Sequence, residues 1–257
     1  MIKDHKAAII ICAGGIGERM GAGKPKQFIE IADGVSIIRK TVDAFRSETV
    51  SRLADIIVVT APEDFVQETD RLVNQDLPEL AEQDRQELTD QDLPESDGRS
   101  TLKNAGQGMP ENAYAHVIAG GGQRQDSVRN ALAFLSERGL KDDDVVLIHD
   151  GARPFITSEI IMSVAEAVLE HDAAIAAVPV KDTIRDSENG TLDRSRLYSV
   201  QTPQGFRFGL IRDAVEQACE DGFYGTDDGS LAERAGVMPV IVPGSYSNIK
   251  ITTPEDL

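Results

Sequence analysis

The chain has 257 residues, of which 40% are hydrophobic, and a formal charge of −18 at pH 7. This length allows one large domain or two small ones, with ample residues for a hydrophobic core. The negative charge argues against a nucleic-acid-binding surface, which normally carries a basic patch, and no apolar run approaches the roughly 20 residues that span a bilayer.

The cysteines and the amino-terminal residues predict a cytoplasmic protein. The opening MIKDHK runs directly into an apolar segment and has no signal-peptide pattern. The two cysteines, Cys12 and Cys219, lie in a predicted strand and a predicted helix, which suggests reduced thiols.

The first predicted element is a buried strand over Ala7–Cys12, because this run is short, apolar and rich in β-branched residues. The loop after it combines glycines with cations: Gly14, Gly15, Gly17, Arg19, Lys24 and Lys26. Glycine leaves backbone N–H groups open to a ligand, and cations neutralise its charge. A strand, a glycine loop and cations in this order predict a polyphosphate site, although a plain β-to-α turn with solvated charges has the same local pattern.

Two common nucleotide motifs do not fit this loop. The dinucleotide fingerprint G-x-G-x-x-G fails because Met20 stands where its third glycine belongs. The Walker pattern fails because Gly23-Lys24 is followed by Pro25.

Helical and strand patterns then alternate along most of the chain. We expect helices over 36–47, 63–73, the residues up to 135, 158–171, 210–220 and 230–234, and strands over 55–60, 116–119, 144–148, 173–179 and 238–242. This alternation predicts one α/β domain over 1–257, a Rossmann-like, mostly parallel twisted sheet flanked by helices. Ligands bind outside the carboxyl ends of such strands, where the glycine loop, Gly120–Ser127 and His149–Pro154 all lie.

Two stretches interrupt the alternation. Residues 75–112 are polar and acidic and contain QDLPE twice, which favours a partly disordered insertion over a small interaction element. Residues 181–206 contain the turn signal Asn189-Gly190 and predict a β-hairpin arm, either an active-site flap, a dimerisation arm or a plain exposed hairpin. The chain ends at a helix start, Thr253-Pro254, so we expect further C-terminal residues.

Together these segments resemble the 2-C-methyl-D-erythritol 4-phosphate cytidylyltransferases of the non-mevalonate isoprenoid pathway. The blocks that carry the resemblance are AGGIGERM, PKQF, GGQRQDSV, HDGARPF, PVKDTIR, QTPQGF, TDD and NIKITTPEDL. They cover the chain in family order except for 75–112. The ribitol-5-phosphate cytidylyltransferases share some blocks, but PVKDT and HDGARP favour the methylerythritol enzymes.

The resemblance implies that CMP is transferred from CTP to a sugar-alcohol phosphate, with release of pyrophosphate. Positioning and charge stabilisation do nearly all the work in such a reaction. Because the attacking group is a phosphate oxygen that is already anionic, no side-chain base is required.

The resemblance also implies roles for particular residues. Arg19 and Lys26 would stabilise the reacting α-phosphate, whereas Lys24 lies outside the PKQF block and is interpreted as a solvated loop charge. The nucleotide contacts would be Ala13, Gly14, Gly15, Ile16, Gly17, Gly121, Arg124, Ser127, Gly151 and Lys250. The acceptor contacts would be Asp150, Arg153, Thr183, Thr202 and Thr226.

Further expectations concern the metal and the partner. Asp150 would also bind Mg²⁺, which prefers one or two carboxylates together with phosphate oxygens, and His149 is interpreted as structural. In this family the arm reaches into the neighbouring subunit's site, so Arg194, as a catalytic residue, and Thr202 would act in trans within a homodimer. Gly151 stands where the family usually has alanine, which predicts a slightly looser loop.

Two other functions remain open. The same chemistry on ribitol 5-phosphate is the first, and a non-catalytic nucleotide-binding module is the second. The basic residues Arg19, Lys26, Arg153 and Lys250 argue against the module, because a sensor need not stabilise a transition state. A nicotinamide dehydrogenase is disfavoured by the failed glycine fingerprint.

Overall fold

A computed structural model describes residues 5–14, 25–31, 33–75, 77 and 114–257. The predicted insertion at 75–112 therefore lies almost entirely outside the described residues. Within them, no helix is both long enough and apolar enough to cross a membrane.

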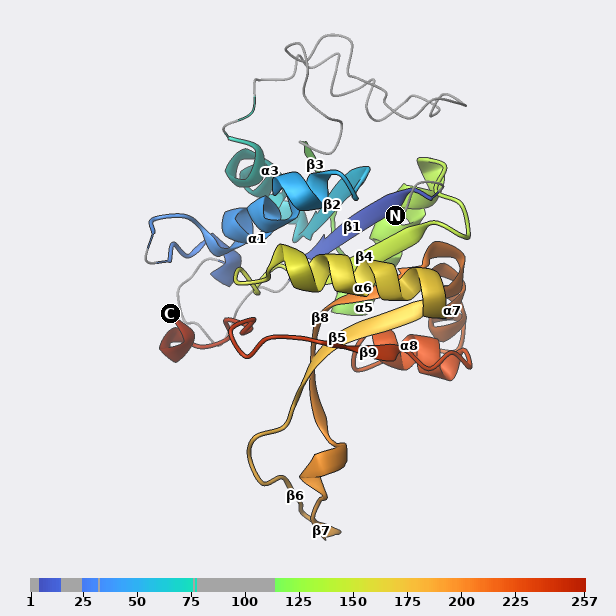
Figure 1. Cartoon of the computed structure of the whole chain (residues 1–257). Helices are drawn as coiled ribbons and strands as arrows, with labels where there is room; N and C mark the ends of the chain where they lie inside the picture. Colours follow the sequence, from blue (N-terminus) through green and yellow to red (C-terminus); the bar gives the residue numbers. More distant parts are fainter. Residues whose placement is uncertain (1–4, 15–24, 32, 76, 78–113) are drawn as a thin grey trace.

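A seven-stranded sheet forms the centre of the molecule, in the order β3-β2-β1-β4-β8-β5-β9 (Figure 1). Its strands are β1 (Ala7–Cys12), β2 (Ile56–Ala61), β3 (Ala115–Ala119), β4 (Val145–Asp150), β5 (Ala173–Pro179), β8 (Tyr198–Arg207) and β9 (Val240–Pro243). Among the described strands of this sheet, β8 alone runs antiparallel to its neighbours. The predicted mostly parallel sheet is confirmed.

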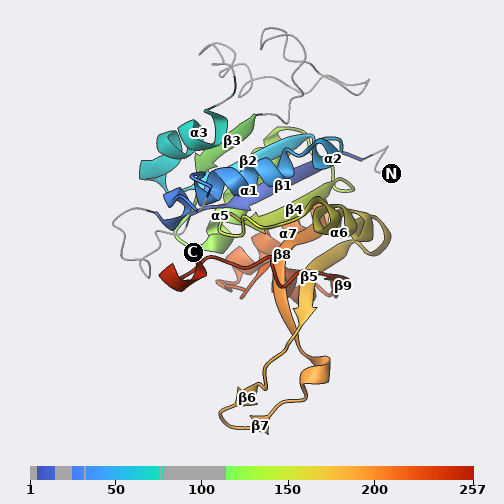
Figure 2. The same cartoon turned by 60° about the vertical axis from the view of Figure 1, so that its left-hand side comes forward.

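Helices cover both faces of this sheet (Figure 2). One face carries α1 (Ile37–Phe45), α2 (Glu48–Ser51), α3 (Val66–Asn74) and α6 (Ser158–His171). The other carries α5 (Arg124–Glu137), α7 (Phe208–Glu220) and α8 (Asp228–Arg234). Short 3-10 turns complete the body at η2 (Lys26–Phe28), η3 (Glu63–Phe65) and η6 (Pro254–Asp256). Where an element was predicted, these bounds agree with it to within a few residues, whereas α2 and η2 have no predicted counterpart.

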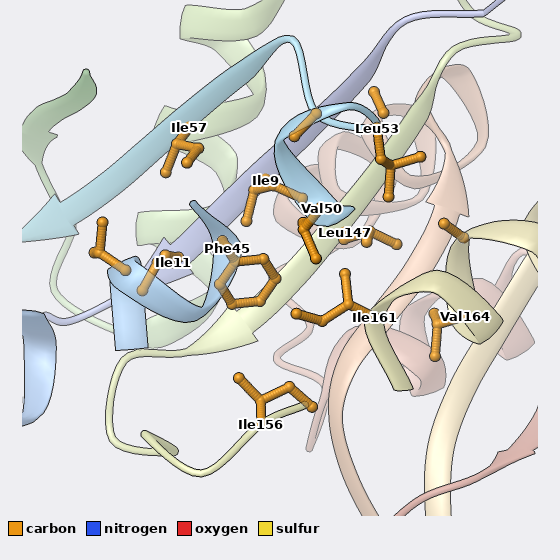
Figure 3. Close-up of a cluster of buried hydrophobic side chains, with 14 of the residues drawn as sticks. Ile9, Ile11, Phe45, Val50, Leu53, Ile57, Leu147, Ile156, Ile161 and Val164 are labelled. Carbon is orange, nitrogen blue, oxygen red and sulfur yellow. The ribbon is translucent and has the colours of Figure 1, made fainter. Parts of the chain in front are cut away.

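The two apolar cores follow directly from the alternation of side chains along a strand. In β1, Ile9 and Ile11 face one helical layer, where Phe45 and Ile161 pack in the same cluster (Figure 3). The intervening residues of β1 face the opposite layer. Because both faces of the strand are buried, its sequence is continuously apolar rather than alternating.

The assignment of the whole stretch 181–206 to the arm is wrong at its carboxyl end. Gln201–Phe206 belong to β8, and Gln204–Arg207 are hydrogen-bonded in register with β4. Pro203 and Gly205 argue against a central strand by their local preferences. Gly205 is nevertheless required there, because a Cβ would lie 2.7 Å from Val168 and 2.8 Å from Leu147.

The remaining part of the stretch does form an arm that projects from the sheet (Figures 1 and 2). It carries the short antiparallel pair β6 (Arg185–Asp186) and β7 (Gly190–Thr191), followed by η5 (Arg194–Arg196). Gly190 has a φ of 85° and already pairs with Asp186, so the predicted two-residue turn is instead a three-residue connection. The carboxylate of Asp186 stabilises it by accepting from the backbone N–H of Glu188 at 2.8 Å.

Candidate active site

The candidate site is built around Asp150, the last residue of β4. Asp150 pairs in register with Cys12, the last residue of β1, so it lies at the carboxyl edge of the sheet where the glycine loop begins. Only 7% of the surface of Asp150 is exposed to solvent. Its backbone N–H donates to Thr202 Oγ1 at 3.0 Å, because Thr202 lies on the adjacent strand β8. The backbone of Asp150 is therefore held from both neighbouring strands.

Three cations surround this carboxylate. Arg124 Nε lies 3.1 Å from Oδ1, and Lys250 Nζ and Arg153 Nε lie 2.9 and 3.4 Å from Oδ2. Burial alone raises the pKa of Asp150, but Arg124 and Lys250 outweigh burial and hold this pKa well below its usual range. Asp150 therefore stays ionised at neutral pH.

Arg124 also binds a second buried carboxylate. Its Nη2 donates to Asp228 Oδ2 at 2.7 Å, and Asp228 is 1% exposed. We call Asp150, Arg124, Arg153, Lys250 and Asp228 the Asp150 cluster; it carries one net positive charge. This local charge stands out in a chain of net charge −18. Sequence reasoning missed Asp228, although it belongs to the TDD block that contributed to the resemblance.

The C-terminal segment, which carries Lys250 of the cluster, also binds a second lysine, Lys26. Lys26 Nζ donates to the backbone carbonyl of Ile251 at 2.8 Å, and Lys250 precedes that residue. Ile251 is fully buried, and its N–H donates to Ala152 O at 2.9 Å. Arg153 is fixed by the same segment, because its Nη1 donates to Asn248 O at 2.7 Å.

The described start of the glycine loop lies beside the loop Gly120–Ser127, which is predicted to contact the base and ribose. Ser127 Oγ accepts from the Gly121 N–H at 3.0 Å and donates to Gln123 O at 3.1 Å. It also lies 3.2 Å from where a Cβ on Gly14 would stand. A Cβ on Gly121 would lie 2.2 Å from Asp126 Cβ, so only glycine fits there. The backbone of Ala13 is held by Thr60, whose carbonyl accepts its N–H at 2.9 Å.

The loop at Gly151 is tightly packed, in contrast to the slightly looser loop that glycine at this position predicts. Its N–H donates to Cys12 O at 2.9 Å. A Cβ at this position would lie 3.0 Å from Cys12 O and Ile38 Cδ1, and 3.1 Å from Ala13 Cβ. Alanine at position 151 would therefore require small shifts of these neighbours.

Not every predicted residue that the structure describes lies in the Asp150 cluster, and some predicted residues are not described. Gly15, Ile16, Gly17 and Arg19 lie outside the described residues. Thr183 and Thr226 are exposed, the first on the arm and the second just before α8. Arg194 also lies on the arm, where its Nη1 donates to Lys181 O at 2.8 Å.

Thr202 does not belong to the arm, so the expectation that it acts in trans on a partner's acceptor is not supported by its position. It is 5% exposed and lies inside its own subunit's sheet. Its hydroxyl accepts from Asp150 N–H and lies 3.0 Å from Nδ1 of the fully buried His149. Thr202 therefore fixes the backbone of Asp150 from the adjacent strand. His149 is buried in the core, which agrees with its interpretation as a structural residue.

Comparison with known proteins decides the family. The family model described as 2-C-methyl-D-erythritol 4-phosphate cytidylyltransferase matches residues 7–82 and 99–257. The chain belongs to this family. It is accordingly a nucleotidyltransferase. Residues 1–6 and 83–98 are unmatched, and 83–98 lie within the predicted insertion.

Relatives of the same name match nearly the whole chain. The 2-C-methyl-D-erythritol 4-phosphate cytidylyltransferase of Bacillus cereus is 40% identical, covering 97% of this chain and 93% of its own. That of Syntrophus aciditrophicus is 37% identical, with 98% and 93% covered. Among solved structures, the Francisella tularensis cytidylyltransferase is similar with a TM-score of 0.70 at 27% identity, covering 98% of this chain and 96% of its own.

The buried histidines of this cytidylyltransferase predict how its stability depends on pH. Burial lowers the pKa values of His149 and His116 to about 4, from an ordinary 6.5. Below about pH 6.5 the unfolded chain binds protons that the folded chain does not, so the free energy of unfolding falls until about pH 4. At pH 5 each histidine is expected to lower it by about 2 kcal/mol.

Urea unfolding at pH 7 and pH 5 measures this loss. His116→Phe should reduce it, because phenylalanine preserves the ring contacts with Tyr114 and Phe134 but cannot titrate. His171→Gln, at an exposed position, is the matched control and should leave the difference unchanged. An unchanged difference in His116→Phe would contradict the assignment.

Proposed function

We propose that the Asp150 cluster binds the reacting phosphates while CMP passes from CTP to 2-C-methyl-D-erythritol 4-phosphate, giving 4-diphosphocytidyl-2-C-methyl-D-erythritol and pyrophosphate. The observation that carries the proposal is a set of three cations held by one ionised carboxylate at the carboxyl edge of the sheet. This is where ligands of open α/β sheets bind. Membership of the cytidylyltransferase family supplies the reaction.

Each step of binding and catalysis is assigned to particular residues, some of them on the family resemblance alone. Backbone N–H groups of the glycine loop, Gly14–Gly17, hold the triphosphate, whereas the N–H of Ala13 is already donated to Thr60 O. Gly121 and Ser127 define the pocket for cytosine and ribose. Arg153, whose guanidinium is anchored to Asn248 O, contacts the acceptor phosphate through its planar fork. Lys26 and Arg19 stabilise the charge that develops at the α-phosphorus as the acceptor oxygen attacks in line.

Mg²⁺ fits this site as a cofactor held mainly by the substrate. No group of three or more histidine, cysteine or acidic side chains arranged for a metal exists among the described residues, so these residues by themselves form no complete cage. Asp150 remains ionised, and its Oδ1 has Arg124 as its one hydrogen-bonding partner in the described structure. One carboxylate together with phosphate oxygens and waters suits Mg²⁺. Bound there, the ion would neutralise charge on the triphosphate.

The arm supports a homodimer in which subunits exchange arms. It projects from the body and exposes the apolar side chains of Ile184, Leu192 and Tyr198. Arg194 would then complete the partner's site. Mixing Arg194→Ala chains with Arg19→Ala chains should restore part of the activity that each homodimer lacks, because one site of the mixed dimer receives both arginines. Complete absence of complementation would contradict arm exchange.

A cytoplasmic location is part of the proposal. Cys12 and Cys219 are both free thiols, as is usual for proteins of a reducing compartment. Fractionation of the native host's cells tests it, and recovery outside the cytoplasm would contradict it.

The function is tested by incubating the purified protein with CTP and Mg²⁺ and following pyrophosphate release. Methylerythritol 4-phosphate is the expected acceptor, and ribitol 5-phosphate serves as the comparison. Turnover with ribitol phosphate alone would replace the proposed acceptor. The absence of turnover with either would favour a non-catalytic nucleotide-binding module.

A further inference from the structure

Gln204 is a buried amide that joins β8 to the first turn of α8. It is 1% exposed. Its Nε2 donates to Asp227 Oδ2 at 2.8 Å, and its Oε1 accepts from the Gly229 N–H at 2.8 Å. A single side chain thus holds the residue before Asp228 and the residue after it.

These bonds fix the helix start that carries Asp228. Asp227 is the N-cap of α8, where its Oδ1 accepts from the Ser230 N–H at 2.9 Å. Asp227 therefore uses one oxygen to begin the helix and the other to bind Gln204. Asp228 lies between these two attachments and points its carboxylate to Arg124 Nη2 at 2.7 Å.

Arg124 depends on two carboxylates for its direction. Asp228 holds Nη2 while Asp150 accepts from Nε, so the guanidinium is oriented by a residue from α8 and one from β4. The strand β8 supports both, through Thr202 behind Asp150 and through Gln204 behind Asp228. Neither Gln204 nor Asp228 was among the predicted site residues.

We propose that Gln204 is a positioning residue for nucleotide binding: by holding both neighbours of Asp228, it keeps Arg124 aimed at the CTP site. The inference rests on the proposed function, in which Arg124 belongs to the cluster that binds the reacting phosphates of CTP and the acceptor. Glutamine suits this position because the site needs a donor for the carboxylate of Asp227 and an acceptor for the N–H of Gly229 at once. Neither a hydrocarbon nor an ionised carboxylate provides both.

The first test is Gln204→Met, which has a similar size but makes neither hydrogen bond. We expect KM for CTP to rise on the order of 10-fold, as is typical when a supporting partner of a binding group is lost, with a smaller change in kcat. Calorimetric Kd for CTP should shift equally. Asp228→Asn should give a similar shift. The double variant should lose little more CTP affinity than either single variant, because both residues act through Arg124.

The second test is Gln204→Glu. A merely structural role for Gln204 would not predict that the CTP affinity of this variant depends on pH. An ionised glutamate repels Asp227, whereas a protonated one donates to it as glutamine does. Burial beside a carboxylate favours the protonated form, so CTP affinity should recover as pH falls from 8 to 6. The matched control is Gln217→Glu. In the wild type, Gln217 Nε2 also donates to an aspartate, Asp221, at 3.2 Å, but on the surface of α7. The CTP affinity of this control should equal that of the wild type at every pH.

The outcomes separate the two proposals. Wild-type protein without cytidylyl transfer would overturn the proposed function. Wild-type turnover with unchanged CTP affinity in folded Gln204→Met would overturn the positioning role alone. If Gln204→Met does not fold, the pH profile of Gln204→Glu decides: recovery toward acid supports the role, and a profile parallel to the wild type overturns it.

Discussion

Replacing Asp150 with asparagine is expected to lower kcat/KM on the order of 10²–10³-fold. Asparagine keeps the shape of the side chain and the backbone hydrogen bond to Thr202, but it removes the negative charge that holds Arg124, Arg153 and Lys250. These cations then repel one another and lose their common orientation. Steady-state pyrophosphate release, measured against each substrate in turn, gives the effect.

The free energy of unfolding of Asp150→Asn should fall only modestly, although its kcat/KM falls strongly. The side chains of Lys250 and Arg124 are 41% and 32% exposed, so water compensates part of the lost charge. The matched control is Asp142→Asn, which also removes an aspartate bound to an arginine, Arg212 at 2.7 Å, but at the surface. Its activity should equal that of the wild type. Near-normal turnover of Asp150→Asn would show that the cluster does not bind the reacting phosphates.

Replacing Lys26 with methionine is expected to reduce kcat by about 10²–10³-fold, with smaller changes in either KM. Methionine retains much of the unbranched apolar stem but removes the ammonium group that donates to Ile251 O near the cluster. A charge that acts mainly on the transition state affects kcat rather than ground-state binding. Single-turnover rates with saturating CTP measure the chemical step directly.

Lys24→Met is the control that the sequence itself offers. Lys24 lies two residues before Lys26 but outside the PKQF block, and we expect its replacement to leave kcat close to that of the wild type. Equal losses in both variants would mean that the total charge of the loop matters rather than the position of Lys26. Unchanged kcat in Lys26→Met would remove this residue from the proposed mechanism.

Much of the fold and part of the site could be predicted from the sequence because their signals are local. The apolar run of Ala7–Cys12 and the alternation of strands with helices predict a mostly parallel sheet. The carboxyl ends of such strands share one edge. Asp150 and Arg124, whose roles the family resemblance implies, lie at or just after the ends of strands at that edge, and the structure places Arg124 Nε 3.1 Å from Asp150 Oδ1.

The sequence alone therefore determined the α/β architecture, the edge that carries the site and the family to which the chain belongs. Only the tertiary structure decided that β8 enters the sheet between β4 and β5, against the local preferences of Pro203 and Gly205. It also decided the contacts that depend on that strand, from Thr202 to Asp150 and from Gln204 to Gly229. Such contacts join segments far apart in the chain, so no local pattern encodes them; they form because packing the whole sheet and its helices outweighs the preferences of a few residues.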